Sequence, residues 1–358
     1  MKNEVDFKNP IFISLESNVL TALEQMNASK RKLLIVVEGI RFISVLSIGD
    51  IQRAIINKYD LTKSIQPILR NIITVCLDTD SLENIKQKML KLRAECMPVL
   101  DKENNLVRIF FWEDMFGSQE ARKKAFLGLP VVIMAGGRGS RLMPLTNVLP
   151  KPLLPINEKT IIEDIMEAFV KVGCNQFYLS VNYKSDMIRH YLNGLNNAEY
   201  KIEYFEEEKP LGTAGSMYLI KDKIKSTFFV SNCDILIDQD LEEIYKYHLQ
   251  NKNDITVVSA IKRYKIPYGT IETKQDGILS CLDEKPELIF QINTGMYILE
   301  PHTLNLIPKN SFFHLTHLIE LVNKNGGKVG VFPIPENSWQ DIGNWEDYNR
   351  AINTNIIC

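Results

Sequence analysis

The chain has 358 residues, enough for two or three domains of ordinary size. Its 42 lysines and arginines and 44 aspartates and glutamates give a formal net charge of −2, which excludes the strongly basic surface typical of nucleic-acid-binding proteins. No segment approaches the roughly 18 apolar residues of a membrane span, and the N-terminal segment MKNEVDFKNP lacks the apolar core of a signal peptide. We therefore expect neither a nucleic-acid nor a membrane partner.

The cysteines are widely spaced along the chain, and they form neither a C-x-x-C motif nor a zinc-binding pattern with histidine. This spacing favours reduced thiols in a cytoplasmic protein. The six are Cys76, Cys96, Cys174, Cys233, Cys281 and Cys358.

An internal repeat occupies the first third of the chain. The apolar run Leu33 to Val37 aligns with Cys96 to Leu100, and each run follows a stretch with helical spacing of apolar residues. Each repeat therefore predicts a helix, a short strand, a turn, a second strand and a second helix. Two such units can pack face to face and bury surface that neither buries alone.

This repeat resembles a tandem pair of CBS domains, also called a Bateman module, with the first domain at residues 1–60 and the second at 61–120. In that family a Ser or Thr three residues before an Asp often holds the ribose of an adenine nucleotide. Ser47 and Asp50 match this pattern, whereas Phe111 replaces the hydroxyl residue before Asp114. The resemblance therefore implies an adenine or guanine nucleotide at one site rather than two. The alternative is that both aspartates only cap helices.

Residues 121–129 look like a linker, and apolar runs then alternate with amphipathic stretches through residues 130–358. Near-continuous apolar strands separated by helices predict an α/β fold with a doubly wound, mostly parallel sheet. In such sheets ligands bind beyond the carboxyl ends of the strands. The expected strands lie at residues 131–135, 176–181, 228–232 and 255–260.

The first of these runs leads into the glycine-rich segment MAGGRGSRLMPLT, Met134 to Thr146. Glycines allow backbone N–H groups to approach and cradle phosphates, and arginine side chains add fork-shaped donors. The P-loop pattern is absent, and Leu142 stands where a dinucleotide-binding G-x-G-x-x-G motif needs glycine. A lysine held between two prolines follows in PKPLLPI. The candidate phosphate-binding residues are Gly136, Gly137, Arg138, Gly139, Arg141 and Lys151.

Together, GGRGSRLMPLT and PKPLLP resemble the signature of the sugar-1-phosphate nucleotidyltransferases. The resemblance implies a Rossmann-like, GT-A-like nucleotidyltransferase fold after the CBS module. It also implies a Mg²⁺-dependent reaction in which NTP and a sugar 1-phosphate give an NDP-sugar and pyrophosphate.

The resemblance also implies roles for individual residues. Cys233 stands where the family usually has glycine, which leaves the neighbouring carboxylate of Asp234 untouched. The implied catalytic residues are Arg141, Lys151, Asp234 and Lys285, and the implied Mg²⁺ ligands are Asp234 and Asp341. The implied nucleotide-binding residues are Ala135, Gly136, Gly137, Gly139, Glu207, Gly212 and Thr213. The implied sugar-binding residues are Gly269, Glu284, Asn293 and Thr294.

Glu207 points to guanine as the base. Guanine presents two adjacent hydrogen-bond donors, which one carboxylate can accept, and uridylyltransferase relatives have Gln where Glu207 stands. This favours GTP as the donor. The alternative is that Glu206, Glu207 and Glu208 form a solvated acidic run.

The order of the domains resembles a narrower group, the PtmE-type glucosamine-1-phosphate guanylyltransferases of bacterial legionaminic acid synthesis. That resemblance implies glucosamine 1-phosphate as the acceptor. The sequence does not determine the oligomeric state, and a homodimer or a higher homo-oligomer is left open. Other open interpretations are a mannose-1-phosphate guanylyltransferase and a glucose-1-phosphate thymidylyl- or uridylyltransferase. A non-catalytic CBS nucleotide sensor is the alternative from a different class.

Overall fold

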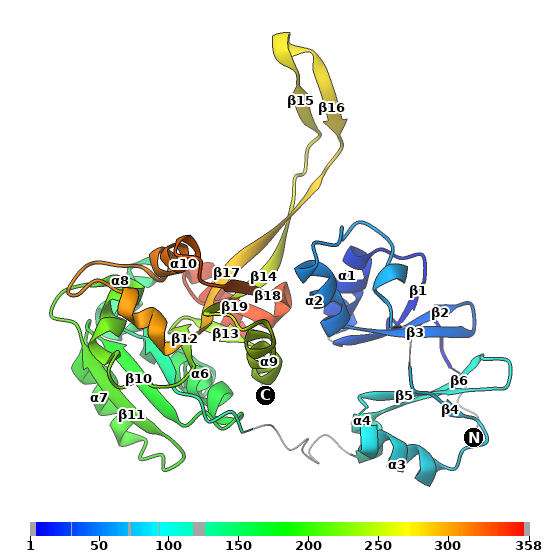
Figure 1. Cartoon of the computed structure of the whole chain (residues 1–358), viewed down its shortest axis with the longest axis horizontal. Helices are drawn as coiled ribbons and strands as arrows, with labels where there is room; N and C mark the ends of the chain where they lie inside the picture. The colour runs from blue at the N-terminus through cyan, green and yellow to red at the C-terminus, as the bar shows by residue number, and fades with distance from the viewer. Residues whose placement is uncertain (1–4, 30, 71–72, 93, 117–125, 354–358) are drawn as a thin grey trace. The chain divides into compact units, whose positions relative to one another are not determined.

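The structure is a computed structural model that describes residues 5–29, 31–70, 73–92, 94–116 and 126–353, without the side chains of Glu113, Asp114 and Asn353 (Figure 1). The chain divides into two compact units, Met1–Lys123 and Lys124–Cys358, named here the N-terminal and C-terminal units. Among the described residues, no helix is long and apolar enough to cross a membrane.

The N-terminal unit contains the predicted repeat. Each half forms a three-stranded sheet whose first two strands are parallel and whose last two are antiparallel. The first half consists of β1 (Phe12–Ser14), α1 (Val19–Ser29), β2 (Leu33–Glu38), β3 (Arg41–Ser47) and α2 (Ile48–Ile56), followed by η1 (Gln66–Ile68). The second consists of β4 (Cys76–Leu77), α3 (Leu82–Leu92), β5 (Cys96–Leu100), β6 (Leu106–Phe111) and α4 (Trp112–Phe116). The short leading strands β1 and β4 were not predicted.

The two halves of the N-terminal unit share one hydrophobic core. Ile35 and Val45 of the first half pack in the same buried cluster as Cys96 and Leu100 of the second. The two turns also meet, because the backbone N–H of Leu106 donates a 2.9 Å hydrogen bond to the carbonyl of Ile40. The predicted face-to-face packing of the repeats is therefore confirmed.

The C-terminal unit is built on a seven-stranded sheet with the order β11-β10-β7-β12-β17-β14-β18. Only β17 runs antiparallel to its neighbours, so the predicted mostly parallel sheet is confirmed. The strands are β7 (Val131–Met134), β10 (Gln176–Val181), β11 (Lys201–Glu206), β12 (Phe228–Asn232), β14 (Ile255–Lys265), β17 (Glu287–Leu299) and β18 (Val329–Pro335).

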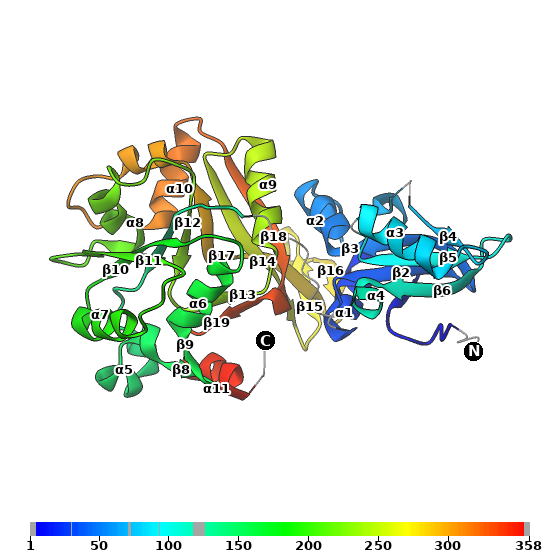
Figure 2. The same cartoon turned by 90° about the horizontal axis from the view of Figure 1, so that it is seen from below.

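Helices cover both faces of this sheet because successive side chains of each buried strand point to opposite sides. Val131 and Ile133 of β7 belong to one core cluster, whereas Val132 and Met134 belong to the other. On the first face lie α6 (Ile161–Val170), α7 (Ser185–Gly194), α9 (Leu241–Asn251) and α11 (Trp345–Asn353). On the second lie α8 (Gly212–Gly215), η4 (Ser216–Ile220) and α10 (Leu315–Lys324). Helix α8 lies beside α10, as Figure 2 also shows.

Short elements connect these layers. Around the glycine-rich segment lie η2 (Ser140–Leu142), α5 (Leu145–Val148), η3 (Lys151–Leu153), β8 (Pro155–Ile156) and β9 (Lys159–Thr160). Further along are β13 (Ile235–Ile237), β15 (Thr270–Thr273), η5 (Gln275–Gly277), β16 (Leu279–Asp283), η6 (Pro301–Leu306), η7 (Glu336–Ser338) and β19 (Trp339–Asp341).

Two features of this topology position the candidate site. The chain leaves β7 for β10 on one side and later returns to β12 on the other, so the glycine-rich segment follows the strand at which the order reverses. Ligands bind at this switch point in open α/β sheets. In addition, β14 and β17 continue beyond the sheet and carry the hairpin β15–β16 away from the body of the unit (Figure 1). We call residues 264–290 the arm.

Candidate active site

The glycine-rich segment folds back onto the lysine that follows it. Gly139 has a left-handed φ of 63°, and a methyl group there would lie 2.9 Å from Thr146 Cγ2 and 3.1 Å from Lys151 Cβ. The Thr146 hydroxyl donates a 3.0 Å hydrogen bond to the Gly139 carbonyl. At Gly137, by contrast, a methyl group would meet no atom within 4 Å. Glycine is thus required at residue 139 for packing, and the backbone at residue 137 is open to a ligand.

Lys151 and Asp234 come from distant segments and form an ion pair. Their Nζ and Oδ2 atoms are 2.5 Å apart, and the lysine side chain is only 8% exposed. Asp234 lies just beyond the carboxyl end of β12, at the edge of the sheet where ligands are expected. The structure therefore brings together two of the residues for which the resemblance implies a catalytic role.

Asp341 lies close to Asp234 because it ends β19, which pairs antiparallel with β13, the strand that follows Asp234. Ile235, which follows Asp234, pairs with Asp341, and the Ile342 N–H donates a 2.8 Å hydrogen bond to the Asp234 carbonyl. Burial raises the pKa of Asp341, and the negative charge of Asp234 raises it further. The two carboxylates are thus close enough to repel each other.

Arg141 lies beside Asp341, and Gly343 provides the space between them. A methyl group at Gly343 would lie 2.8 Å from Asp341 Oδ1 and 3.2 Å from both terminal nitrogens of Arg141. The positive charges of Arg141 and Lys151 partly oppose the rise in the Asp341 pKa. Sequence reasoning missed Gly343, although it lies in the WQDIG motif that contains Asp341.

The cluster of Asp234 and Asp341 fits a magnesium ion. Mg²⁺ is usually bound through one or two carboxylates, substrate phosphates and retained waters rather than by a complete protein cage. Among the described residues, no three His, Cys, Asp or Glu side chains gather as a ready metal site. Two mutually repelling carboxylates, with the candidate phosphate-binding residues Arg141 and Lys151 beside them, match the smaller donor set that Mg²⁺ uses.

Glu207 is buried beside the glycine-rich segment. Its Oε1 accepts a 3.1 Å hydrogen bond from the Ser180 hydroxyl, and its Oε2 accepts a 2.6 Å bond from the Leu211 N–H. Glu206 and Glu208 are exposed, and Glu206 pairs with Arg189 at 3.1 Å. The alternative of a solvated acidic run is therefore wrong for Glu207.

Asn182 joins Glu207 to the glycine-rich segment. Its amide donates a 2.7 Å hydrogen bond to the Glu207 carbonyl, and a methyl group at Gly136 would lie 3.3 Å from Asn182 Cβ and 3.4 Å from Glu207 Oε1. The buried Ala135 is hydrogen-bonded to the carbonyl of Ser180. Sequence reasoning missed Ser180 and Asn182, which appear only as polar residues at the end of an apolar run.

Gly212 and Thr213 hold the LGTA segment against the chain that precedes α10. A methyl group at Gly212 would lie 2.8 Å from the Phe313 carbonyl, and Gly212 has a left-handed φ of 78°. The Thr213 hydroxyl accepts a 3.0 Å hydrogen bond from the Leu315 N–H. The contacts that the structure gives both residues are thus within the protein, and their assignment to the nucleotide remains a prediction.

The residues assigned to the sugar separate into two groups. Asn293 and Thr294 lie near the end of β12, because a methyl group at the neighbouring Gly295 would lie 2.5 Å from Asn232 Nδ2. Thr294 is buried and donates a 2.8 Å hydrogen bond to the Val258 carbonyl. This group therefore lies beside the strand end that leads to Asp234.

The second group lies on the arm. A methyl group at Gly269 would lie 2.9 Å from Glu284 Oε2, and Lys285 follows with a left-handed φ of 53°. Strand β17 runs without interruption from Glu287 to Asn293, so these two residues are roughly 20 Å apart. Glu284 and Lys285 lie beyond Glu287, farther still from Asn293. The structure therefore does not bring Gly269, Glu284 and Lys285 to Asp234, contrary to the expected single site.

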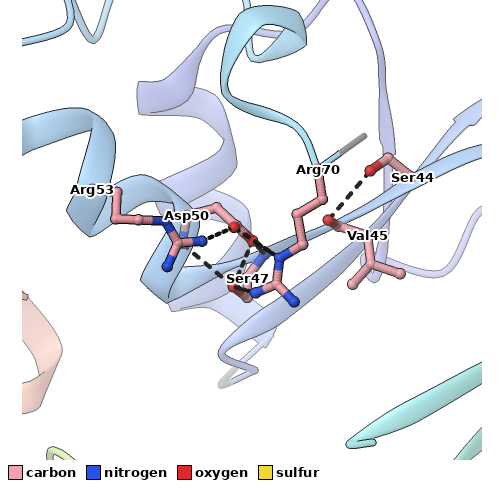
Figure 3. A network of polar contacts seen from close by, with 6 residues as sticks. All are labelled: Ser44, Val45, Ser47, Asp50, Arg53 and Arg70. Atoms are coloured by element: carbon pink, nitrogen blue, oxygen red, sulfur yellow. Dashed lines mark hydrogen bonds and ion pairs between the residues drawn. The ribbon is translucent and has the colours of Figure 1, made fainter. Parts of the chain in front are cut away.

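In the N-terminal unit, Ser47 and Asp50 form a capping box at the start of α2 (Figure 3). The Ser47 hydroxyl donates a 2.6 Å hydrogen bond to Asp50, and Arg70 donates bonds of 2.8 Å to Asp50 and 2.7 Å to Ser47. Arg53 also contacts the buried Asp50 carboxylate. Burial would raise the pKa of Asp50, but the bonds from Arg70 and Ser47 outweigh burial and lower it.

The capping role of Asp50 is therefore confirmed, while its role toward a nucleotide stays a prediction. The side chain of Asp114 lies outside the described residues, so its expected role is not addressed by the structure. Sequence reasoning missed Arg70, which follows the predicted pair by twenty residues and belongs to no recognised motif.

Comparisons with known proteins agree with this organisation. The nucleotidyl transferase family model matches residues 130–356, and the CBS domain model matches residues 3–57. The chain is 32% identical over 228 residues to a mannose-1-phosphate guanyltransferase of Pichia angusta, a match covering 61% of each protein. It is 30% identical over 229 residues to mannose-1-phosphate guanylyltransferase 1 of Arabidopsis thaliana, covering 62% of this chain and 63% of the relative. The chain thus spans about three fifths of the length of these curated relatives.

A solved structure shares the fold. It comes from Bacillus anthracis and is named as a glucose-1-phosphate thymidylyltransferase in complex with sucrose. The match has a TM-score of 0.51 at 19% identity and covers 64% of this chain and 98% of the other. With the family match to residues 130–356, which is more than half of the sequence, the chain belongs to the nucleotidyl transferase family and carries a CBS domain at its N-terminus.

Proposed function

We propose that the protein transfers GMP from GTP to a sugar 1-phosphate and so forms a GDP-sugar and pyrophosphate in the cytoplasm. The observation that carries this proposal is the cluster of Lys151, Asp234 and Asp341 beside the glycine-rich segment at the switch point of the sheet. A degenerate domain acting only as a nucleotide sensor would have no need to keep a buried lysine paired with one of two adjacent carboxylates.

The chemistry needs positioning more than acid–base catalysis. A sugar-phosphate oxygen is already a nucleophile at neutral pH, so no general base is required. The barrier lies in bringing two polyanions together and in stabilising charge at the α-phosphate. The loop amides near Gly137, Arg141 and Lys151 would hold the phosphates of GTP. Mg²⁺ held by Asp234 and Asp341 would supply positive charge at the reacting phosphates.

Guanine selection is assigned to Glu207. Each carboxylate oxygen has more than one acceptor position, so the bonds from Ser180 and Leu211 leave acceptor capacity for the two adjacent donors of guanine. A glutamine at this position could keep both internal bonds, since its carbonyl can accept from Leu211 and its amide can donate to the Ser180 hydroxyl. It would then present a donor to guanine where the carboxylate presents an acceptor.

We therefore expect Glu207→Gln to fold normally and to lower kcat/KM for GTP relative to UTP. The lost charged hydrogen bond corresponds to about 1.5–3 kcal/mol, or roughly a 10- to 150-fold change in this ratio. Initial rates with GTP and UTP at fixed sugar 1-phosphate measure it. Glu206→Gln is the matched control, because that side chain is exposed. An unchanged ratio in Glu207→Gln would remove the residue from base selection.

For the acceptor we propose glucosamine 1-phosphate, which would place the product in legionaminic acid or other surface-glycan precursor synthesis. The support is the order of a CBS module followed by a guanylyltransferase-like unit. Mannose 1-phosphate is the second candidate, because the curated relatives are named as mannose-1-phosphate guanylyltransferases. Pyrophosphate release from a matrix of four NTPs and glucosamine, mannose and glucose 1-phosphates tests the choice. The GTP and glucosamine 1-phosphate pair is expected to have the highest kcat/KM.

We also propose that the first repeat of the N-terminal unit binds one purine nucleotide, with Ser47 and Asp50 contacting its ribose. Arg70 must then share or release its bonds to these two residues. Calorimetry of the full chain with AMP is expected to show one binding site. Asp50→Asn should abolish this heat, since the variant keeps a cap acceptor but loses the charge. Asp114→Asn, the matched change in the second repeat, should retain the heat, and loss of heat in both variants would contradict a single site.

A further inference from the structure

The arm exposes a concentration of large apolar side chains. Of the described residues, eight large hydrophobics between positions 264 and 290 are from 43% to 75% exposed. No described part of the C-terminal unit covers them. They are Tyr264, Tyr268, Ile271, Ile278, Leu279, Leu282, Leu288 and Phe290.

These side chains are gathered in pairs across the ribbon. Ile271 lies opposite Leu282 and Tyr264 opposite Leu288, and residues opposite each other on paired strands share a face. The rings of Tyr264 and Phe290 also meet edge to face, with their centroids 5.9 Å apart. A two-stranded ribbon without a covering layer is at best marginally stable in water. The arm therefore has the apolar composition of a buried hairpin, although no described element of the C-terminal unit packs over it.

The exposed area of the arm is large enough for a stable interface. If each large side chain, aromatic or aliphatic, is taken to have an area near the lower part of the 150–250 Å² range of aromatic side chains, the exposed fractions of the eight sum to roughly 800 Å². A standard protein–protein interface buries about 800 Å² on each partner. In a two-fold dimer the same patch is buried on both copies, so one arm supplies enough apolar surface for a closed, symmetric interface.

The arm also carries Glu284 and Lys285, which the resemblance assigns to the active site. Glu284 and Lys285 lie beyond Glu287, itself roughly 20 Å along β17 from Asn293. The arm leaves the sheet at the carboxyl edge, where Asp234 lies, because β17 runs antiparallel to β12 and passes its carboxyl end. An arm that projects from this edge points away from its own site but is placed to reach a second molecule.

We propose that the arm docks on a second copy of this chain in a two-fold dimer, and that Glu284 and Lys285 of each copy complete the sugar-phosphate site of the other. The exposed apolar surface of the arm supports the docking. The shared site rests additionally on the proposed function and on the resemblance, which implies a catalytic role for Lys285 and a sugar-binding role for Glu284. A different occupant of the arm, or an arm that bends back onto its own site, is an outcome that the experiments distinguish.

Sedimentation of the full chain at micromolar concentration tests the docking. The wild type is expected to be a dimer, and Ile271→Asp combined with Leu282→Asp is expected to be a monomer with an unchanged circular dichroism spectrum. Glu272 and Cys281 form the adjacent pair on the opposite face of the ribbon, so Glu272→Ser with Cys281→Ser is the matched control and should remain a dimer. A monomeric wild type, or an aspartate variant that stays dimeric, would overturn the docking.

Complementation tests the shared site. Asp234→Asn and Lys285→Met should each be inactive alone, because each lacks one part of every site. When they are co-expressed, half of the dimers are mixed and one of the two sites in each mixed dimer is intact, so activity should recover to about a quarter of wild type. No recovery, or full activity of Lys285→Met alone, would overturn the shared site. An inactive wild type would refute the proposed function, while sedimentation would still decide the docking.

Discussion

Asp234→Asn is expected to lower kcat by about 100- to 1,000-fold, the range found when one electrostatic element of a charged transition state is removed. The substitution preserves shape but removes the charge that faces Lys151 at 2.5 Å and one of two carboxylates that fit Mg²⁺. Asp341→Asn should have a similar effect. Pyrophosphate release under saturating GTP and sugar 1-phosphate measures both. Asp240→Asn is the matched control, since Asp240 caps α9 and asparagine caps equally well.

The raised pKa of Asp341 also predicts that the Mg²⁺ concentration needed for activity depends on pH. Burial and the charge of Asp234 make Asp341 take up a proton at a higher pH than an ordinary aspartate. Protons and Mg²⁺ then compete for the same carboxylate, so the Mg²⁺ concentration for half-maximal rate should increase as the pH falls. Excess Mg²⁺ should restore the rate. Wild-type rates in either asparagine variant, or a Mg²⁺ requirement independent of pH, would contradict the metal assignment.

Lys151→Met is expected to lower kcat/KM by at least about 100-fold, because it removes a pre-positioned positive charge from the reacting phosphates. It also leaves Asp234 without its lysine. Breaking a fully buried ion pair by removing one partner typically costs about 3–5 kcal/mol of stability, and because Asp234 is 21% exposed we expect a smaller cost here. The thermal midpoint should therefore fall as well. Added Mg²⁺ should recover part of this stability, since the cation would take over the neutralisation of Asp234.

The matched control for Lys151→Met is Lys159→Met. Lys159 also contacts a carboxylate at 2.5 Å, that of Glu167, but its side chain is 49% exposed. Exposed pairs contribute little to stability, so this variant should keep the activity and the thermal midpoint of the wild type. Equal effects of the two substitutions would show that the loss reflects removal of any lysine and not the chemistry at residue 151.

The strands of the C-terminal sheet could be predicted because their apolar character is local. The runs at 131–135, 176–181 and 228–232 match β7, β10 and β12 within one residue at each end. The run at 255–260 was too short, because β14 continues through Lys262, Arg263 and Tyr264. Those residues mix polar and apolar types, and only their pairing with β17 shows that the strand continues.

The active site was partly predictable for the same reason. Lys151, Asp234 and Asp341 each lie in a recognisable segment, although the sequence alone does not give the distances between them. The burial of Glu207 could not be predicted, since three consecutive glutamates look like a surface and its bonds come from Ser180 and Leu211. Gly343 has no side chain to suggest a role and matters only because Asp341 and Arg141 lie against it.

The position of the arm could not be predicted from the resemblance to the nucleotidyltransferases. The motif containing Glu284 and Lys285 implied a position beside the other site residues, but the continuous pairing of residues 259–265 with residues 287–293 carries it outward. A strand register depends on pairing between segments that are far apart in sequence. For Asp50, the sequence was consistent with both a helix cap and a nucleotide-binding residue. Neither pattern predicted the hydrogen bond from Arg70.

The most direct test of the proposed activity follows the fate of each phosphate of GTP. The purified full chain is incubated with Mg²⁺, glucosamine 1-phosphate or mannose 1-phosphate, and GTP labelled at either the α- or the γ-phosphate. The proposal predicts that the α-label appears in a GDP-sugar, that the γ-label appears in pyrophosphate in equal amount, and that a chelator stops both. Release of the γ-label as inorganic phosphate, transfer of the α-label to free GMP, or no turnover with any NTP and sugar 1-phosphate would contradict it.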